Sequence, residues 1–239
     1  MKKSILLSAL IAVTLLMGSC KKESVKPSGS ITTETRNLTG FDALDVSDAI
    51  DVEVTFDPNV ESVVVEANSN LHQYILTDVV AGRLKVRIKN NVRIKSGATI
   101  KIYVSTTFLD AVGISGASRV EFTNELITSF LDLDISGAST FQGGMTVTDF
   151  DADASGASDI EIWGSSNASK MDLSGASKIT DEDFVMNDLD IDLSGASRAT
   201  LTVNGVINIS ASGASSLDYY GTGLIDNLES SGGSSINKH

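Results

Sequence analysis

The sequence predicts an all-β fold: a right-handed parallel β-helix of about 20 residues per coil, preceded by a β-rich N-terminal cap unit. The first observation is a repeat, Ser-Gly-Ala-Ser, which begins at Ser115, Ser136, Ser155, Ser174, Ser194 and Ser212, with the variant Ser-Gly-Gly-Ser at Ser231. The seven copies begin 21, 19, 19, 20, 18 and 19 residues apart. A fixed period near 20 residues is typical of a solenoid.

The second observation is alternation around each copy. The residues three and one before the first serine are mostly apolar, while the residue between them is acidic in the column Asp134, Asp153, Asp172 and Asp192. This period of two predicts strands with one buried face. The leucine and asparagine ladder of leucine-rich repeats and the Gly-Gly-x-Gly-x-Asp calcium repeat are both absent. A parallel β-helix remains, and parallel crossovers are nearly always right-handed.

The third observation is the glycine at the second position of every copy. A coil of this length must bend, and glycine adopts positive φ at little cost. We therefore expect seven structural corner glycines: Gly116, Gly137, Gly156, Gly175, Gly195, Gly213 and Gly232.

The N-terminus predicts export and lipidation. Residues 1–19 read as a signal peptide, with Lys2 and Lys3 before an apolar run that is too short for a permanent membrane span. The following Cys20 stands where a bacterial lipobox places its lipidated cysteine, although Met17 replaces the commoner leucine. An ordinary secretory signal with an incidental cysteine is the alternative. We expect residues 20–38 to be a polar tether.

The folded part then divides into two. Residues 39–110 are predicted to form an N-terminal β-unit that caps the rod, and residues 111–239 the β-helix. Within the first unit, "VSDAIDV" at residues 46–52 is similar to a degenerate corner, and Ala81 and Gly82 are predicted to turn a hairpin.

Composition narrows the functional classes. Hydrophobic residues make up 41% of the chain but aromatic residues only 5%, so an aliphatic core is expected. The formal net charge of −13 disfavours both nucleic acid and anionic lipid headgroups as partners of the surface as a whole. Cys20 is the only cysteine, so no internal disulfide can form.

The lipobox, the stretch "FDALDVSDAIDVEV" and the iterated "SGAS" corners together resemble the bacterial family described as putative auto-transporter adhesin, head GIN domain. The likeness covers about residues 39–235. It implies an envelope protein of the kind found in Bacteroidota, a β-helical adhesin-like domain and no catalytic residues.

Catalysis is not indicated by the residues themselves. A nucleophilic serine needs an oriented base, and the chain has only His72 and His239. Carboxylates are dense around Asp149–Asp153, Asp181–Asp183 and Asp188–Asp192, but most fall on outward strand positions. A glycosidase pair and calcium ligands are therefore minor hypotheses, and Asp134, Asp153, Asp172 and Asp192 are the candidate metal ligands. We expect Trp163 to pack or to cap a coil, with sugar stacking as the alternative.

The predicted function is a lipid-anchored envelope protein, in an outer membrane, with a structural or adhesin-like role and no cofactor beyond a calcium candidate. Its expected partners are the membrane, through the anchor, and a glycan, a protein or a second copy on the ladder surface. A sensing or ligand-binding module is the alternative, and a polysaccharide-active enzyme is a further one. The sequence leaves the membrane leaflet open.

Overall fold

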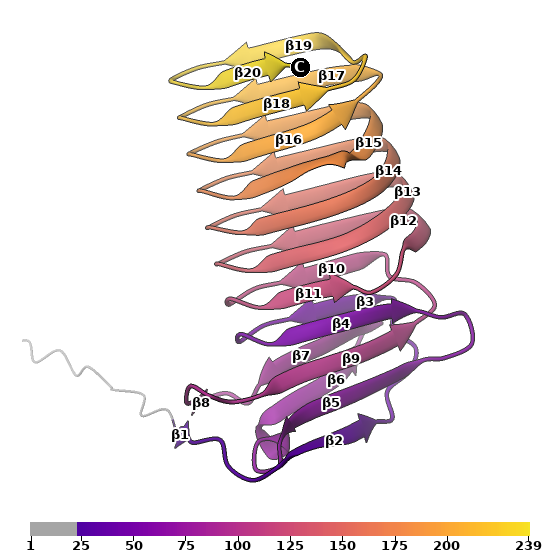
Figure 1. The fold of residues 1–239 in the computed structure, drawn as a ribbon, viewed down its shortest axis with the longest axis vertical. Helices are drawn as coiled ribbons and strands as arrows, with labels where there is room; N and C mark the ends of the chain where they lie inside the picture. Colours follow the sequence, from indigo (N-terminus) through magenta and orange to yellow (C-terminus); the bar gives the residue numbers. More distant parts are fainter. Residues whose placement is uncertain (1–22) are drawn as a thin grey trace, which may run out of the picture.

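The computed structural model describes residues 23–239, and about 65% of the chain is strand. Stacked parallel strands form a solenoid of about seven turns with about 19 residues per turn (Figure 1). Strands on the far side run toward the Ser-Gly-Ala-Ser corner, those on the near side run away from it, and the stack rises, so the coil is right-handed. The predicted fold class is confirmed.

The cap and first coil contain ten strands and one 3₁₀-helix: β1 (Glu23–Val25), β2 (Ile31–Arg36), β3 (Ala43–Val46), β4 (Asp51–Phe56), β5 (Ser62–Asn68), η1 (His72–Tyr74), β6 (Ile75–Val80), β7 (Arg83–Ile88), β8 (Val92–Ile94), β9 (Ile100–Thr106) and β10 (Ala111–Ile114). The rod continues with β11 (Arg119–Phe122), β12 (Leu126–Ile135), β13 (Thr140–Ala154), β14 (Asp159–Leu173), β15 (Lys178–Leu193), β16 (Arg198–Val203), β17 (Val206–Ala211), β18 (Ser216–Tyr220), β19 (Leu224–Ser230) and β20 (Ser235–Lys238).

Each coil has two walls that meet at the corner. Sheet A holds the strands that lead into the corner: β7, β3, β10, β12, the second halves of β13, β14 and β15, then β17 and β19. Sheet B holds the strands that leave it: β9, β4, β11, the first halves of β13, β14 and β15, then β16, β18 and β20. The long strands β13, β14 and β15 turn from sheet B to sheet A without a break.

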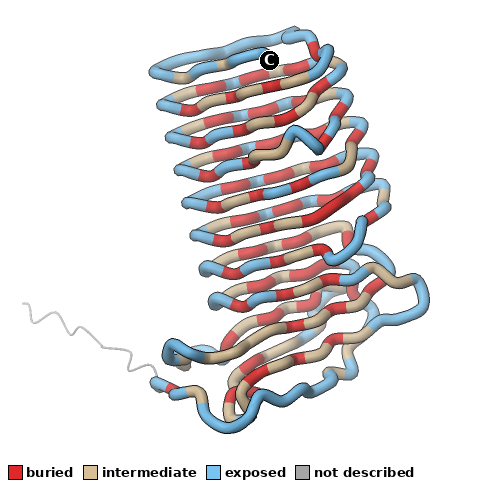
Figure 2. Tube along the Cα trace, viewed as in Figure 1, coloured by how far each residue is buried: buried red, intermediate tan, exposed pale blue. Residues whose placement is uncertain are grey.

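The register follows the apolar columns of the sequence. The inward column of sheet A pairs Val112 with Leu133, then Ala152, Met171, Ile191 and Ile209 in successive coils. All six residues are buried, and buried segments lie above one another in successive coils up to the last coil, which is mostly exposed (Figure 2). A shift of one residue would expose every one of them, so burial fixes the register.

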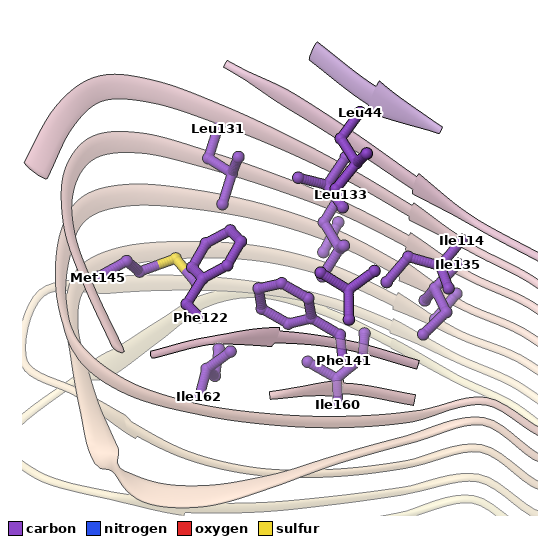
Figure 3. Packing of buried hydrophobic residues seen from close by; sticks show 14 of the residues in the cluster. Leu44, Ile114, Phe122, Leu131, Leu133, Ile135, Phe141, Met145, Ile160 and Ile162 are labelled. Atoms are coloured by element: carbon purple, nitrogen blue, oxygen red, sulfur yellow. The ribbon is translucent and has the colours of Figure 1, made fainter. Parts of the chain in front are cut away.

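The few aromatic side chains reinforce this aliphatic core. Phe56, Phe122 and Phe141 lie in successive coils of sheet B and meet edge to face, with ring centroids 4.8 and 4.9 Å apart. Ile114 and Ile135 stack in the same way close to the corner (Figure 3). Edge-to-face pairs add about 0.5–1.5 kcal/mol each to the burial of the rings.

Each corner is a tight turn that continues the hydrogen-bond ladder. All seven corner glycines have φ between 67° and 80°. The alanine N–H donates to the glycine carbonyl of the preceding coil, for example Ala176 N to Gly156 O at 2.7 Å. The fourth residue is buried in every copy except the last, where Ser234 is half-buried. In one copy, Ser177 Oγ donates to Ser174 O (2.7 Å) and to Ala154 O (3.1 Å). The motif therefore allows successive turns to stack closely, and the hydroxyl group of its last serine stabilises the turn from the buried side.

The N-terminal unit contains further coils of the same kind and then terminates the stack with antiparallel strands. The segment Ser47–Ile50 is a corner with positive φ at Asp48 and Ala49, and its flanking strands β3 and β4 pair with β10 and β11, as the degenerate copy predicted. The hairpin at Ala81 and Gly82 also forms, between antiparallel β6 and β7. The antiparallel strands β2, β5 and β6 terminate the two sheets, which blunts the edges that a parallel stack leaves open.

The order of coils in the cap differs from the order of the chain. The coil of β7 and β9 lies outside that of β3 and β4, because β7 pairs with β3 and β9 with β4. Residues 57–110 therefore descend to the end of the stack and return before β10 begins. The N-terminal unit shares both sheets with the rod.

The segment expected to be a polar tether over residues 20–38 is partly structured. Ile31–Arg36 forms β2, paired antiparallel with β5, and Glu23–Val25 forms β1, paired with β8. An edge strand exposed on both faces needs no apolar alternation, and the isoleucine and three threonines of "ITTETR" favour extended backbone. Among residues 23–239, no helix is long and apolar enough to cross a membrane. The predicted signal peptide and the predicted lipidation site at Cys20 lie outside the described residues.

Candidate functional site

An acidic face covers the outer side of sheet A over four adjacent coils, β12 to β15. We define it by the outward side chains of Asp132, Asp134, Asp149, Asp151, Asp153, Lys170, Asp172, Asp188, Asp190 and Asp192. These residues alternate with buried ones such as Phe150 and Leu189, and that alternation turns the acids outward.

Two columns run along this face. Asp134, Asp153, Asp172 and Asp192 pair in direct register. Two residues earlier on each strand lies a second column, Asp132, Asp151, Lys170 and Asp190, again in register. Neighbouring parallel strands lie about 4.8 Å apart, so like charges stand close to one another along both columns.

The electrostatics of the face reflect this crowding. The pKa of Asp172 is raised above its ordinary value, first because partial burial removes water and then because Asp153 and Asp192 repel its charge; Lys170 opposes the shift. The pKa of Asp132 is raised in the same way, by desolvation and then by Asp151. The face is therefore short of positive charge, and a cationic or hydrogen-donating partner would relieve it.

A shallow hollow of about 350 Å³ opens within the acidic face. It forms at Ala168, whose small side chain stands in register between Asp149 and Asp188. Lys170 and Asn208 also line it and supply donors among the carboxylates. This combination of acceptors and donors fits a polar ligand rather than an apolar one.

The candidate calcium ligands do not assemble a metal centre. Within residues 23–239 no group of three His, Cys, Asp or Glu side chains is placed to hold a metal ion. Asp134, Asp153, Asp172 and Asp192 project from one flat sheet in parallel, whereas calcium needs six to eight oxygens that converge on a point.

No serine of the corner motif has a histidine partner among the described residues. His72 is buried in η1, where Nε2 lies 2.9 Å from Thr32 Oγ1 and Nδ1 lies 3.7 Å from Glu34 Oε2. The second distance is too long for a hydrogen bond, so the arrangement is not a complete triad. This contact was not predicted, because β2 itself was not expected. His239 instead stacks on Tyr220 at the other end of the rod.

The outer side of sheet B is mixed in charge. Its outward column contains Arg119, Thr140, Asp159, Lys178 and Arg198 in register, and Asp159 and Lys178 form an ion pair at 2.9 Å. Within this column, opposite charges therefore lie side by side and neutralise each other.

Trp163 lies on sheet B in the middle of the rod, so it caps neither end of the stack, and its ring packs only in part. The side chain is 41% exposed in mid-rod, and its pyrrole edge rests on Gly144, where a Cβ would collide with the ring. The register between β14 and β15 shifts beside it, between Ile160 and Gly164. Nothing in the alternation pattern marks this irregularity, which explains why the sequence did not place the ring.

Comparisons with known proteins agree with this architecture. No curated protein sequence matches the chain. A putative adhesin from Bacteroides fragilis superposes with a TM-score of 0.85 at 18% identity, covering 90% of this chain and 100% of that one. A putative lipid binding protein from Parabacteroides distasonis gives 0.75 at 16% identity, covering 91% and 100%, and a putative adhesin from Parabacteroides merdae gives 0.67 at 15% identity, covering 91% and 99%.

At these identities the similarity shows the fold alone. The family description and the names of these three structures denote adhesins or a binding protein. The sequence profile of the family described as putative auto-transporter adhesin, head GIN domain, matches residues 40–223, more than half of the chain. The chain belongs to this family.

Proposed function

We propose that this protein is a lipid-anchored, non-catalytic binding protein of the bacterial cell envelope, and that the acidic face is its binding surface. One observation carries the proposal: nine aspartates and Lys170 stand in register on four adjacent coils around a hollow of about 350 Å³. Outward aspartates that repel one another weaken the fold, so a ligand that uses them explains their arrangement better than stability does.

The ligand chemistry follows from the lining. Carboxylates accept hydrogen bonds from hydroxyl groups, and Lys170 and Asn208 donate to ring or carbonyl oxygens. Columns repeating at about 4.8 Å present these groups as a ladder, which suits an extended, hydroxyl-rich chain. We therefore propose a glycan as the ligand. The names of the similar structures, two adhesins and a lipid binding protein, support a binding role.

A glycan array tests the surface with two matched double variants. Asp151→Asn with Asp190→Asn removes two charges from the acidic face, whereas Glu121→Gln with Glu161→Gln removes two from sheet B. We expect glycan binding to fall at least tenfold in the first and to persist in the second. Equal losses in both, or full binding by both, would contradict the assignment of the face, and binding of a protein but no glycan would overturn the ligand class.

Membrane attachment is tested separately. Cys20→Ala removes the thiol to be acylated, and we expect the protein to leave the membrane fraction after carbonate washing. Retention in membranes would contradict the anchor without bearing on the acidic face.

A further inference from the structure

Charge is segregated along the chain. Residues 102–239 contain 20 acidic and five basic side chains. The segment 83–101 contains seven basic side chains and no acidic one. This protein of net charge −13 thus has one strongly basic segment. The position of that segment in the fold determines which partners it can contact.

This segment forms β7, β8 and the start of β9, at the cap end of the stack (Figure 1). Its middle strand, β8, pairs with β1, with Ser24 opposite Arg93 and Val25 opposite Ile94. The first described residues are therefore fixed directly against the basic segment.

Some of these cations are neutralised and some are not. Arg83 pairs with Asp45 at 2.9 Å, Arg87 with Asp78 at 3.1 Å, and Lys101 with Glu53. In contrast, Lys89, Arg93 and Lys95 of this segment are exposed, as is Lys26 beside β1, whereas Lys85 is half-buried. None of the four exposed cations forms an ion pair with a carboxylate of residues 23–239. We call these four residues the basic end.

A hollow of about 820 Å³ lies beside the basic end, lined by Arg93, Lys95 and Lys101 together with Asp48 and Asp51. Asp48 already accepts a hydrogen bond from Ile88 N at 3.0 Å. The two carboxylates reduce the positive charge inside this hollow, so the exposed, unpaired cations of the basic end attract an anion more strongly than the hollow itself does.

The distance along the chain from the proposed anchor, Cys20, to the first strand is short. Only Lys21 and Lys22 stand between Cys20 and Glu23, the first residue of β1. Three residues span at most about 10 Å when fully extended, and the Debye length at physiological salt is about 8 Å. A membrane that held Cys20 would therefore lie about one Debye length from β1, the strand that pairs with the basic segment.

We propose that the basic end is a docking surface for anionic lipid headgroups, which orients the solenoid so that the cap faces the membrane and the acidic face is held away from it. The inference rests on the proposed anchoring at Cys20. Charge complementarity supports it, since each Lys or Arg near an anionic surface strengthens attachment roughly fivefold. The five basic residues beyond residue 101 are outnumbered fourfold by acids, so the rod itself is repelled.

The test uses the lipidated chain in vesicles. Acylation blocks the only natural cysteine, so Ser96→Cys supplies a single thiol beside the basic end for an environment-sensitive fluorophore, and Ser235→Cys supplies one at the far end. We expect a nitroxide on the lipid headgroup to quench the label at residue 96 much more in vesicles with phosphatidylglycerol than in neutral phosphatidylcholine. High salt should abolish the difference, and the label at residue 235 should not respond.

Two triple variants separate docking from folding. Lys89→Gln, Arg93→Gln and Lys95→Gln should lower the docking equilibrium constant roughly a hundredfold and abolish the lipid dependence of quenching. The control triple Arg119→Gln, Lys178→Gln and Arg198→Gln removes as many charges from the outer side of sheet B, away from the acidic face, and should leave quenching unchanged. Melting temperatures establish that both variants are folded.

The outcomes separate this inference from the anchor. If flotation with vesicles requires Cys20 but quenching is the same for both triple variants, or the same with and without phosphatidylglycerol, the anchor stands and the docking surface is wrong. If Cys20→Ala floats with vesicles as well as the parent, the proposed anchoring fails and the docking inference fails with it.

Discussion

The carbonyl oxygen of Gly156 fills the space that a side chain on Gly175 would need. A Cβ built on Gly175 would lie 2.5 Å from that oxygen, and Gly175 has φ of +72°. The same relationship repeats between Gly195 and Gly175, at 2.6 Å. The five corner glycines from Gly156 to Gly232 are therefore required twice, once by their own turn and once by the turn stacked against it.

Replacing Gly175 with alanine should destabilise the protein by more than about 3 kcal/mol, since positive φ and a backbone collision add together. Gly40→Ala is the matched control, because Gly40 has φ of +77° but nothing within 4 Å of a built Cβ. It should cost only about 1 kcal/mol. Urea unfolding measures both free energies of unfolding. Similar losses in the two variants would mean that the collision with the neighbouring turn contributes nothing to the requirement for glycine.

The last serine of the motif offers a second matched pair. Ser177 and Ser197 occupy equivalent buried positions, but Ser177 Oγ makes two hydrogen bonds whereas Ser197 Oγ has no partner among the described residues. Ser177→Ala should cost about 1–2 kcal/mol, and Ser197→Ala should be neutral or slightly stabilising. Chemical denaturation compares them, and an equal loss at both sites would mean that size rather than hydrogen bonding selects serine here.

The repetitive part of the molecule can be predicted from the sequence for a physical reason. Every coil meets the same neighbours, so the same constraint recurs in every copy of the repeat. Asp153 and Asp172 align across coils by their place in the repeat alone, and their register is confirmed. The degenerate corner at Asp48 is recognisable in the same way, by comparison with better copies.

The non-repetitive features of the fold could not be predicted, because each of them occurs only once in the chain. No second copy indicates that β2 pairs with β5, that β7 stacks outside β3, or that the register shifts beside Trp163. The acidic columns were likewise predictable residue by residue, but the hollow at Ala168 depends on which side chains flank it in adjacent coils. Single contacts of this kind carry no periodic signal.

Asp172 and Asp218 should affect the stability of the fold in opposite directions as the pH changes. The pKa of Asp172 is raised above its ordinary value near 3.8, mainly by desolvation and then by Asp153 and Asp192, so its carboxylate is disfavoured in the folded state. Its contribution to stability is present below pH 3.8 and is lost as pH rises through the folded pKa. Asp172→Asn should therefore stabilise the protein at pH 7. The gain should be only a fraction of a kcal/mol, because the side chain is exposed, and it should vanish in acid.

Asp218 provides the opposite case. Its pKa is lowered, first by the hydrogen bond that Asn237 donates at 2.8 Å and also by His239, so its contribution is present above pH 3.8 and is lost as pH falls through the folded pKa. Asp218→Asn should destabilise at pH 7. Thermal melts from pH 3 to pH 7 measure both, and a change of the same sign at pH 7 would contradict the electrostatic reading.

Salt should stabilise the solenoid through the acidic face. Like charges about 4.8 Å apart repel by about 1 kcal/mol even at the dielectric constant of water, and added ions screen exposed charges of this kind. Because the four stacked aspartates from Asp134 to Asp192 project in parallel rather than converging, we expect calcium chloride and sodium chloride at equal ionic strength to raise the melting temperature equally. Asp153→Asn, which interrupts the column, should raise the melting temperature in low salt and reduce the effect of both salts. A larger rise with calcium that Asp153→Asn abolishes would instead establish specific coordination, and no response to salt or to the substitution would mean that the column does not repel.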